Sequence, residues 1–423
     1  MLVEENVFSD FINKLYGGKK SVVDYHEQRH QDLIRNYQKK FGAEDDVKLF
    51  SVPGRTELGG NHTDHGNGKV LAAAVNLDTI AAASPNGGND IVLYSDGYEE
   101  VYSVNLDLLE KREDETGTSS ALIRGVASFL EDAGFTVGGF NAFVESNVLN
   151  GAGLSSSAAF EILIGVIFSA LFNEQKIPTM ALAKAGQFAE NNYFGKPCGL
   201  MDQLACATGG IIAIDFEDFE NPKIEKINFF FKEYGYKLLI VDTGGNHANL
   251  TDEYSSIPEE MKNVAEILGK QTIRKVERKE LYEHIAEIRK EAGDRALLRA
   301  LHYINENERV EKQKEALKKS DFTEFLSLVK KSGDSSYKLL QNVVSVKKTS
   351  EQGIALALAT TEDFFKSNEI DGVCRVHGGG FAGSIQVYLP VEKVAEYKEF
   401  IEAIFGNGGV IEVEIRVRGA ESS

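Results

Sequence analysis

Apolar residues recur at helical spacing over the first 46 residues, and the pattern changes to short apolar runs between residues 47 and 105. The segment DYHEQRHQDLIRNYQKKFG spaces its apolar residues as an amphipathic helix does. The runs that follow are separated by glycine and asparagine, which is typical of strands joined by turns. The predicted strands are VKLFSV, KVLAAAVNL, TIAAAS and IVLYS, and the segment PGRTELGG is predicted to be a turn after the first of them.

Helices and strands alternate through the middle of the chain. AAFEILIGVIFSALF is almost wholly apolar, which predicts a helix that is buried on all sides. It is flanked by two further predicted helices, SSALIRGVASFLEDAGF and MALAKAGQFAENNYF, and by two predicted strands, FNAFVESNV and GGIIAIDF.

The pattern from about residue 226 onward predicts a second set of strands and helices. A strand, YKLLIVDT, precedes a charged helical block at 255–332 and a helix at 354–365. The end of the chain, RVHGGGFAGSIQVYLP, VAEYKEFIEAIFG and VIEVEIRV, is predicted as strand–loop–strand, helix and strand. We therefore predict an α+β protein with two domains, residues 1–225 and 226–423.

Charge and cysteine content narrow the class of protein. The 423-residue chain has a formal net charge of −19, which disfavours general binding to nucleic acid or to an anionic membrane. Three cysteines indicate a reducing compartment rather than a disulfide scaffold. The N-terminus lacks a signal-peptide pattern, and no apolar run approaches the roughly 20 residues of a membrane helix. We expect a soluble, cytoplasmic protein without nucleic-acid or membrane partners, as a monomer or weak homo-oligomer.

The segment NHTDHGNGK, residues 61–69, contains two histidines three positions apart with a carboxylate and a hydroxyl between them. Its flanks are turn-forming residues, so it is not the helix that an HExxH zinc site requires. A zinc site would also need a third donor, and none nearby in the sequence is convincing. A set of side-chain donors and acceptors instead favours a polyhydroxylated ligand such as a sugar.

Three other segments carry candidate chemistry. In NGAGLSSSAA, residues 150–159, glycines precede a helix start, which would offer free N–H groups to phosphate, although the serines could merely cap the helix. HGGGFAGS, residues 377–384, resembles an esterase oxyanion-hole motif, but the GxSxG elbow that an esterase requires is missing from the sequence. We interpret it as a glycine turn that lines a cleft, with a plain tight turn as the alternative. Asp202, in CGLMDQ, could be a partly desolvated general base or a helix N-cap.

These segments, in this order, resemble the GHMP kinase superfamily and, within it, the galactokinase family. GAGLSSSAA and HGGGFAGS match the phosphate loop and the C-terminal glycine turn of the superfamily. CGLMDQ is similar to the family's CGIMDQ. The galactokinase signature, roughly GRxNLIGEHTDYNGG, is matched by Gly54, Arg55, Leu58, Gly60, His62, Thr63, Asp64 and Gly68.

The resemblance implies a GHMP-kinase-like two-domain fold, with the active site in the cleft between the domains. It implies transfer of the γ-phosphate of ATP to the anomeric hydroxyl of a sugar, with Asp202 as the catalytic carboxylate and Arg55 beside it. Ser157 and Glu190 would bind Mg²⁺. The implied phosphate-binding residues are Gly151, Gly153, Leu154, Ser155, Ser156 and Ser157, and the implied sugar-binding residues are Asn61, His62, Asp64, Gly199 and Tyr254.

The chain departs from the galactokinase signature around the sugar-binding segment. Asn61 replaces a glutamate that pairs with the 6-hydroxyl of the sugar in the family, and Glu57 replaces an asparagine. Plant galacturonokinases also lack that glutamate and, like this chain, have a histidine at position 65. Galactose is therefore the first expected substrate and galacturonate the alternative, and Asn61→Glu would be expected to improve the preference for galactose. A sensor that binds ATP and sugar without turnover is the other alternative. Such a sensor would be expected to have changes near the phosphate loop or the base, whereas Arg55, Ser157, Glu190 and Asp202 are all present.

Overall fold

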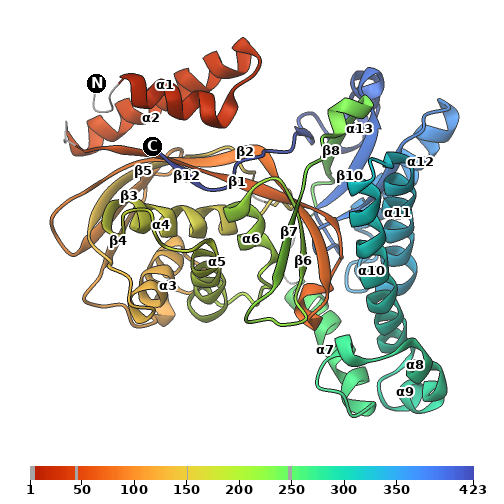
Figure 1. Cartoon of the computed structure of the whole chain (residues 1–423). Helices are drawn as coiled ribbons and strands as arrows, with labels where there is room; N and C mark the ends of the chain where they lie inside the picture. The colour runs from red at the N-terminus through yellow and green to blue at the C-terminus, as the bar shows by residue number, and fades with distance from the viewer. Residues whose placement is uncertain (1–4, 43–45, 150, 246–249) are drawn as a thin grey trace.

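The structure is a computed structural model that describes residues 5–42, 46–149, 151–245 and 250–423 (Figure 1). It contains helices and two sheets, as the sequence pattern predicts, and its N-terminal residues form two helices that lie outside the first sheet. Among the described residues, no helix is long and apolar enough to cross a membrane.

The first sheet has eight strands, in the order β12-β1-β2-β5-β3-β4, with β6 added on β2 and β7 on β6. Two sequence predictions are wrong here. PGRTELGG is not a turn, because β1 runs on to Gly59, and KVLAAAVNL and TIAAAS form the single strand β2. The strands are β1 (Lys48–Gly59), β2 (Lys69–Pro85), β3 (Asp90–Ser95), β4 (Val101–Asn105), β5 (Phe140–Ser146), β6 (Ile211–Asp215), β7 (Lys223–Ile227) and β12 (Glu421–Ser422).

Helices cover both faces of this sheet (Figure 1). Because side chains alternate along a strand, Ala81 and Ala83 of β2 face one helical layer while Ile80 and Ala82 face the other. The first layer is α3 (Ser119–Asp132), α4 (Ser156–Phe172), α5 (Thr179–Phe188) and α6 (Met201–Thr208), and the second is the hairpin of α1 (Glu5–Tyr16) and α2 (Lys20–Phe41). The mainly apolar α4 is buried as predicted.

The second sheet has four strands in the order β11-β8-β10-β9. Its strands are β8 (Tyr236–Asp242), β9 (Val373–His377), β10 (Ser384–Pro390) and β11 (Val410–Val413). The apolar core on one face includes residues of α12 (Gly353–Ser367) and α13 (Val394–Phe405). Helices α10 (Asp294–Lys318) and α11 (Phe322–Ser335) pack together, and α11 contacts β9.

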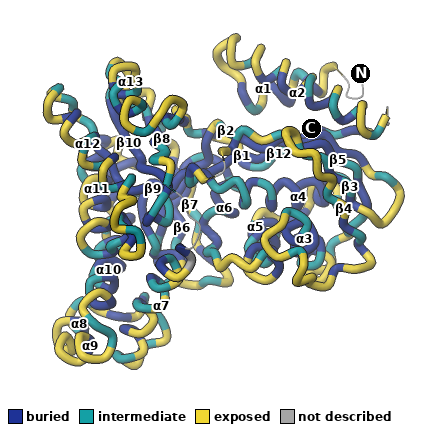
Figure 2. Tube along the Cα trace, turned by 180° about the vertical axis from the view of Figure 1, so that it is seen from behind, coloured by how far each residue is buried: buried dark blue, intermediate teal, exposed yellow. Residues whose placement is uncertain are grey.

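The charged block at 255–332 is a set of helices rather than one long helix. Besides α10 and α11 it contains α7 (Thr251–Ile267), α8 (Arg278–Glu283) and α9 (Ile285–Glu291). Figure 2 shows that the outer sides of α8 and α9 are exposed, while most residues of strands β1, β2, β8, β9 and β10 are buried. The charges of this block therefore face solvent to a large extent.

The chain passes from the first sheet to the second between β7 and β8, close to the predicted boundary at residue 225. One apolar cluster nevertheless contains Phe50 of β1 and Ile240 of β8, and β12 returns to pair with β1. The two halves thus share a core, and their division into domains 1–225 and 226–423 stays a prediction.

Five buried histidines predict how stability depends on pH. Burial lowers the pKa of His26, His30, His62 and His302 to about 4, and that of His377 to about 3. An unfolded histidine has a pKa of about 6.5, so the unfolded chain takes up protons first as the pH falls. The contribution of these neutral histidines to the unfolding free energy should be complete above pH ~6.5. Towards pH ~4 the unfolding free energy should decrease, by up to about 1.4 kcal/mol per pH unit for each histidine.

Urea unfolding across this pH window measures the effect. His26→Gln should reduce the slope, while His284→Gln, at a half-exposed position, should leave it unchanged. An unfolding free energy that stays constant from pH ~6.5 to pH ~4.5 would contradict this expectation.

Candidate active site

Arg55 joins the predicted catalytic aspartate to the predicted phosphate loop. It lies on β1, is 7% exposed, and donates from Nε and Nη2 to the two carboxylate oxygens of Asp202, at 2.6 and 2.5 Å. Its Nη1 donates to the carbonyl of Gly153. Because a guanidinium holds a carboxylate in a fixed bidentate geometry, Arg55 sets the position of both groups.

Asp202 is the second residue of α6, and Leu200 is the N-cap. The N-cap interpretation of Asp202 is therefore wrong, and its carboxylate instead faces Arg55 and accepts from Ser155 Oγ. Burial would raise the pKa of this carboxyl, but the charge of Arg55 and the hydrogen bonds from Arg55 and Ser155 outweigh burial and lower it below its ordinary value. Asp202 is consequently ionised at neutral pH.

The phosphate-loop segment bends sharply before α4. Gly151 and Gly153 have φ angles of 82° and 75°, and Ser155 also lies in the left-handed region, with a φ of 57°. Ser155 occupies the N-cap position, yet its side chain does not cap the helix but binds Asp202. The N–H groups of the first helical turn, which includes Ser156 and Ser157, therefore have no side-chain cap.

Leu154 anchors this loop to the first sheet. Leu154 is fully buried, and its carbonyl accepts from the backbone N–H of Arg55 at 3.0 Å, so it fixes the loop to β1. Asn150 lies outside the described residues, as do residues 246–249 in the segment that leads to Tyr254.

Ser157 and Glu190 meet beside the loop. Ser157 Oγ is 3.1 Å from Glu190 Oε1, and Glu190 is 2% exposed. The helix predicted over this region ends at Phe188 and continues as a π-helical turn, Ala189–Phe194, that carries Glu190. Lys196, which sequence reasoning missed, places its Nζ 2.8 Å from the same carboxylate oxygen.

A second buried carboxyl, Glu161 of α4, lies behind Glu190. Its Oε1 has no hydrogen-bond partner among the residues that the structure describes, and Gln203 donates to Oε2 of both glutamates, at 3.0 and 3.2 Å. Burial raises the pKa of Glu161 well above its ordinary value, and repulsion from Glu190 raises it further. Glu161 is therefore expected to be neutral.

Asp64 and His62 lie in a short loop between β1 and β2. Asp64 is 8% exposed, and a Cβ atom at Gly199 would lie only 1.8 Å from its Oδ2, so glycine is required opposite this carboxylate. His62 Nε2 lies 2.9 Å from the carbonyl of Gly379. Because a carbonyl only accepts, Nε2 carries the proton, and the low pKa of His62, caused chiefly by burial, keeps the ring neutral.

Asn61 lies deeper than the sequence suggests. It is 1% exposed, and its Nδ2 donates to the carbonyl of Gly378 at 2.7 Å and to the carboxylate of Glu57 at 3.2 Å. Its Oδ1 accepts from Asn342 Nδ2 at 2.9 Å and from Ser336 Oγ at 3.3 Å. The amide is thus fully used by protein partners, so Asn61 positions its neighbours rather than offering a free group to a sugar.

The glycine turn between β9 and β10 covers this region. Carbonyls of Gly378, Gly379 and Gly380 accept from Asn61, His62 and, at 2.8 Å, the hydroxyl of Tyr254 on α7. The predicted sugar-binding residues of the two halves are therefore joined by this turn.

The HxxH pair does not form a metal cluster. The rings of His62 and His65 have their centroids 6.4 Å apart. Within the described part of the chain, no three histidine, cysteine, aspartate or glutamate side chains gather as a metal site would require.

Comparison with known proteins agrees with this geometry. The galactokinase galactose-binding signature matches residues 35–85, and the GHMP kinase N-terminal domain matches residues 121–210. The galactokinase of Staphylococcus carnosus is 30% identical over 86% of this chain and 91% of its own length. This chain belongs to the galactokinase family. The galactokinase of Thermotoga petrophila is similarly related, at 31% identity over 82% of this chain and 91% of its own length.

Solved structures confirm the galactokinase-type fold. The Lactococcus lactis galactokinase complexed with galactose superposes with a TM-score of 0.79 and 24% identity, over 93% of this chain and 99% of that one. A mevalonate kinase superposes with a TM-score of 0.59 over 87% of this chain and 99% of its own, at 18% identity. Both confirm the GHMP kinase fold predicted from the sequence, and membership of the galactokinase family makes the chain a sugar kinase.

Relative to the galactokinase signature, this chain exchanges two residues that the structure brings into contact. Where the signature has asparagine and then glutamate, this chain has Glu57 and then Asn61. Glu57 is 3% exposed and forms a buried ion pair with Arg375 of β9. The sequence showed both departures but did not predict that the two side chains touch. Residues 57 and 61 are four positions apart, across the end of a strand and the loop after it, and no spacing rule predicts side-chain contacts there.

Proposed function

We propose that this galactokinase-family chain transfers the γ-phosphate of ATP to the anomeric hydroxyl of galactose. The observation that carries the proposal is the contact of Asp202 with both Arg55 and Ser155. These contacts place the ionised carboxylate of Asp202 at the edge of the loop 151–157, whose backbone N–H groups suit phosphate. A sugar hydroxyl between this carboxylate and a phosphate held by the loop would lie in line for phosphoryl transfer.

In this proposal each residue has a defined task. The oxygen of the C1 hydroxyl attacks the γ-phosphorus, ADP leaves, and Asp202 accepts the hydroxyl proton. Arg55 keeps Asp202 ionised and offsets negative charge on the transferring group. The backbone of residues 151–157 would hold the phosphates. Asp64 would accept from sugar hydroxyls, with His62, Gly199 and Tyr254 around it.

Ser157 and Glu190 fit a Mg²⁺ ion. Their side-chain oxygens are hard donors that lie 3.1 Å apart. The ammonium group of Lys196 lies against Glu190, so this position already binds a positive charge. When bound, Mg²⁺ would neutralise charge on the phosphates.

Lys196 should compete with that ion. Its side chain is 61% exposed, so solvent partly screens its pair with the buried Glu190. We expect Lys196→Met to lower the Mg²⁺ concentration needed for half-maximal ADP binding by about two- to fivefold. Calorimetric titration with Mg²⁺ measures this, and Lys184→Met, at a surface pair with Glu220, is the control. A higher Mg²⁺ requirement in Lys196→Met would mean that the lysine assists binding instead.

Gly199 provides a test of the sugar-binding role of Asp64. Gly199→Ala should displace the Asp64 carboxylate and raise the KM for galactose by about ten- to a hundredfold, because small misplacements are costly in a binding site. ATP KM should stay nearly constant. Gly88→Ala, where the nearest atom is 3.5 Å away, is the control, and an unchanged galactose KM in Gly199→Ala would argue against the role of Asp64.

A neutral hexose suits this site better than a uronic acid. The cations around it are already paired: Arg55 with Asp202, Arg375 with Glu57, and Lys196 with Glu190. Among the described residues, each of these three cations is already neutralised by a carboxylate, although Nη1 of the buried Arg375 has no hydrogen-bond partner. We also expect the enzyme to act in the cytoplasm as a monomer or weak homo-oligomer, without nucleic-acid partners.

Coupled ADP release with a panel of sugars tests the proposed function. Galactose should support turnover, and galacturonate should be poor. Turnover with galacturonate alone would support the alternative substrate. Sugar-dependent thermal stabilisation without ADP release from any sugar would identify a sensor and contradict the proposal.

A further inference from the structure

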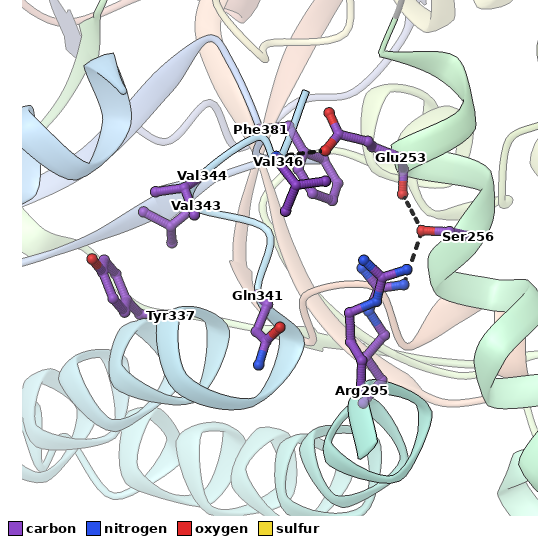
Figure 3. A pocket seen from close by; sticks show the side chains of 10 residues that line it. Glu253, Ser256, Arg295, Tyr337, Gln341, Val343, Val344, Val346 and Phe381 are labelled. Atoms are coloured by element: carbon purple, nitrogen blue, oxygen red, sulfur yellow. Dashed lines mark hydrogen bonds between the residues drawn. The ribbon is translucent and has the colours of Figure 1, made fainter. Parts of the chain in front are cut away.

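A cavity of about 230 Å³ lies between α7, α10 and the segment after α11 (Figure 3). It is smaller than the about 300–1,000 Å³ of pockets for drug-sized ligands, so it suits a small metabolite. Residues from α7, α10, the segment after α11 and the glycine turn line it. They are Glu253, Ser256, Arg295, Arg299, Tyr337, Gln341, Val343, Val344, Val346 and Phe381.

The cavity has a basic side and an apolar side. In Figure 3 the guanidinium groups lie near Ser256, and the valines that follow α11 lie across the opening from them. Arg295 binds the carboxylate of Glu260 through Nε and Nη2. Arg299 is 1% exposed, and it donates to Glu260, to Ser256 Oγ at 2.9 Å and to the carbonyl of Leu340 at 3.1 Å.

Hydrogen-bond donors remain unused on the basic side. Arginine has five N–H donors, yet Nη2 of Arg299 and Nη1 of Arg295 have no partner among the residues that the structure describes. Glu253, the carboxylate that lines the cavity, accepts from Ser345 Oγ at 2.6 Å and from the N–H of Val346 at 2.9 Å. Two guanidinium nitrogens of the arginines that line the cavity thus remain without a partner among the described residues, which favours an anionic ligand.

The wall of this cavity is shared with the sugar-binding region. Glu253 precedes Tyr254 on α7, and Phe381 follows Gly380, the residue whose carbonyl Tyr254 binds. Gln341 precedes Asn342, which donates to Asn61 and to the carbonyl of Gly379. A ligand that moves any of these wall residues also moves a residue of the predicted sugar site.

We propose that this cavity binds a small organic anion, a carboxylate or phosphate monoester on a compact and partly apolar body, and that its occupancy changes the affinity for sugar. Arg295 and Arg299 bind the anionic group, while Val343, Val344 and Phe381 contact the apolar body. The binding step does not depend on the proposed function, whereas the coupling to sugar affinity rests on it.

Titration calorimetry on the whole chain tests the binding step. The active site is first filled with galactose and a non-hydrolysable ATP analogue, so that added anions cannot enter it. The probes are hexanoate, glucose 1-phosphate and inorganic phosphate, with neutral hexanamide for comparison. Arg295→Gln removes a donor, and Val346→Glu places a negative charge at an exposed rim position. Val417→Glu, at another exposed valine that lies outside the cavity, is the matched control.

At least one organic anion should bind saturably to the unaltered chain. The same anion should bind at least about tenfold more weakly to Arg295→Gln, which loses a charge-assisted contact, and to Val346→Glu, which adds charge repulsion. Val417→Glu should bind as the unaltered chain does, and hexanamide should not bind. If one variant fails to fold, the other decides. Lack of saturable binding by every anion, equal affinity in all variants, or equally tight binding of hexanamide would overturn the proposal.

The coupling step is measured separately, by titrating galactose with and without the anion that binds. A shift of galactose affinity in the unaltered chain that is lost in Val346→Glu supports it. An unchanged galactose affinity with the cavity filled would overturn the coupling, while a chain that binds the anion but never turns over sugar would contradict only the proposed function.

Discussion

Asp202→Asn should reduce turnover by about 10²- to 10⁴-fold, the usual contribution of a general base, while ATP binding stays nearly unchanged. The asparagine retains the shape of the side chain and can still contact Arg55 and Ser155, so the loop at residues 151–157 keeps its position. Only the capacity to accept the hydroxyl proton and the negative charge are lost. Single-turnover kinetics with galactose, together with calorimetric titration of ATP, measure the two effects.

A matched control is available in Asp294→Asn. Asp294 also lies in the first turn of a helix and pairs with an arginine, Arg289, but on the surface of α10. The Asp294→Asn variant should retain full turnover. Substantial residual turnover in Asp202→Asn would show that this carboxylate is not the base.

Glu57 and Asn61 should behave as one unit in a double-mutant cycle. Asn61→Glu alone would place a second buried carboxylate beside Glu57, and Glu57→Asn alone would leave Arg375 without its partner. We expect each change to lower the unfolding free energy by about 3–5 kcal/mol, the usual consequence of an unpaired buried charge. The double variant keeps one carboxylate and one amide, so its loss should be smaller than the sum by about 1–3 kcal/mol.

Urea unfolding of the four proteins in this cycle measures the coupling. Strictly additive losses would contradict the idea that the two residues form one unit. The sequence alone suggested that Asn61→Glu would improve the preference for galactose. The buried contacts of Asn61 predict instead that the single variant loses stability, and that sugar preference is informative only in the double variant.

Much of the site could be predicted from the sequence because its parts are local. A glycine–serine bend before a helix has its own physical signature, and Asp202 stands out as an acid in an apolar helix start. The link between the loop and Asp202 could not be predicted from either segment. Arg55 provides this link. It lies on β1, in the segment PGRTELGG that the sequence pattern predicted to be a turn.

The misread strand has a physical cause. Proline and glycine favour turns in isolation, but here Pro53 lies opposite Asp78 in a ladder that shifts register between Pro53 and Arg55. Tertiary pairing with β2 therefore overrides the local preference. In the same way the stretch 75–78 in the middle of β2 looked like a turn, although β1 pairs with β2 on both sides of it.

Residues that act over long sequence distances were the ones missed. Arg375 meets Glu57 from the other half of the chain, and Asn342 meets Asn61 from the segment after α11. Lys196 lies close to Glu190 in sequence, but only the π-helical turn brings its ammonium group to that carboxylate. No periodicity or spacing rule predicts such contacts.

The most direct test of the central claim is a crystal structure with galactose and a non-hydrolysable ATP analogue. The β- and γ-phosphates should contact the backbone of residues 151–157, and the C1 hydroxyl of the sugar should lie within hydrogen-bond distance of Asp202. Phosphates bound away from this loop, or a sugar whose C1 hydroxyl lies beyond the reach of Asp202, would contradict the assignment of this site to phosphoryl transfer.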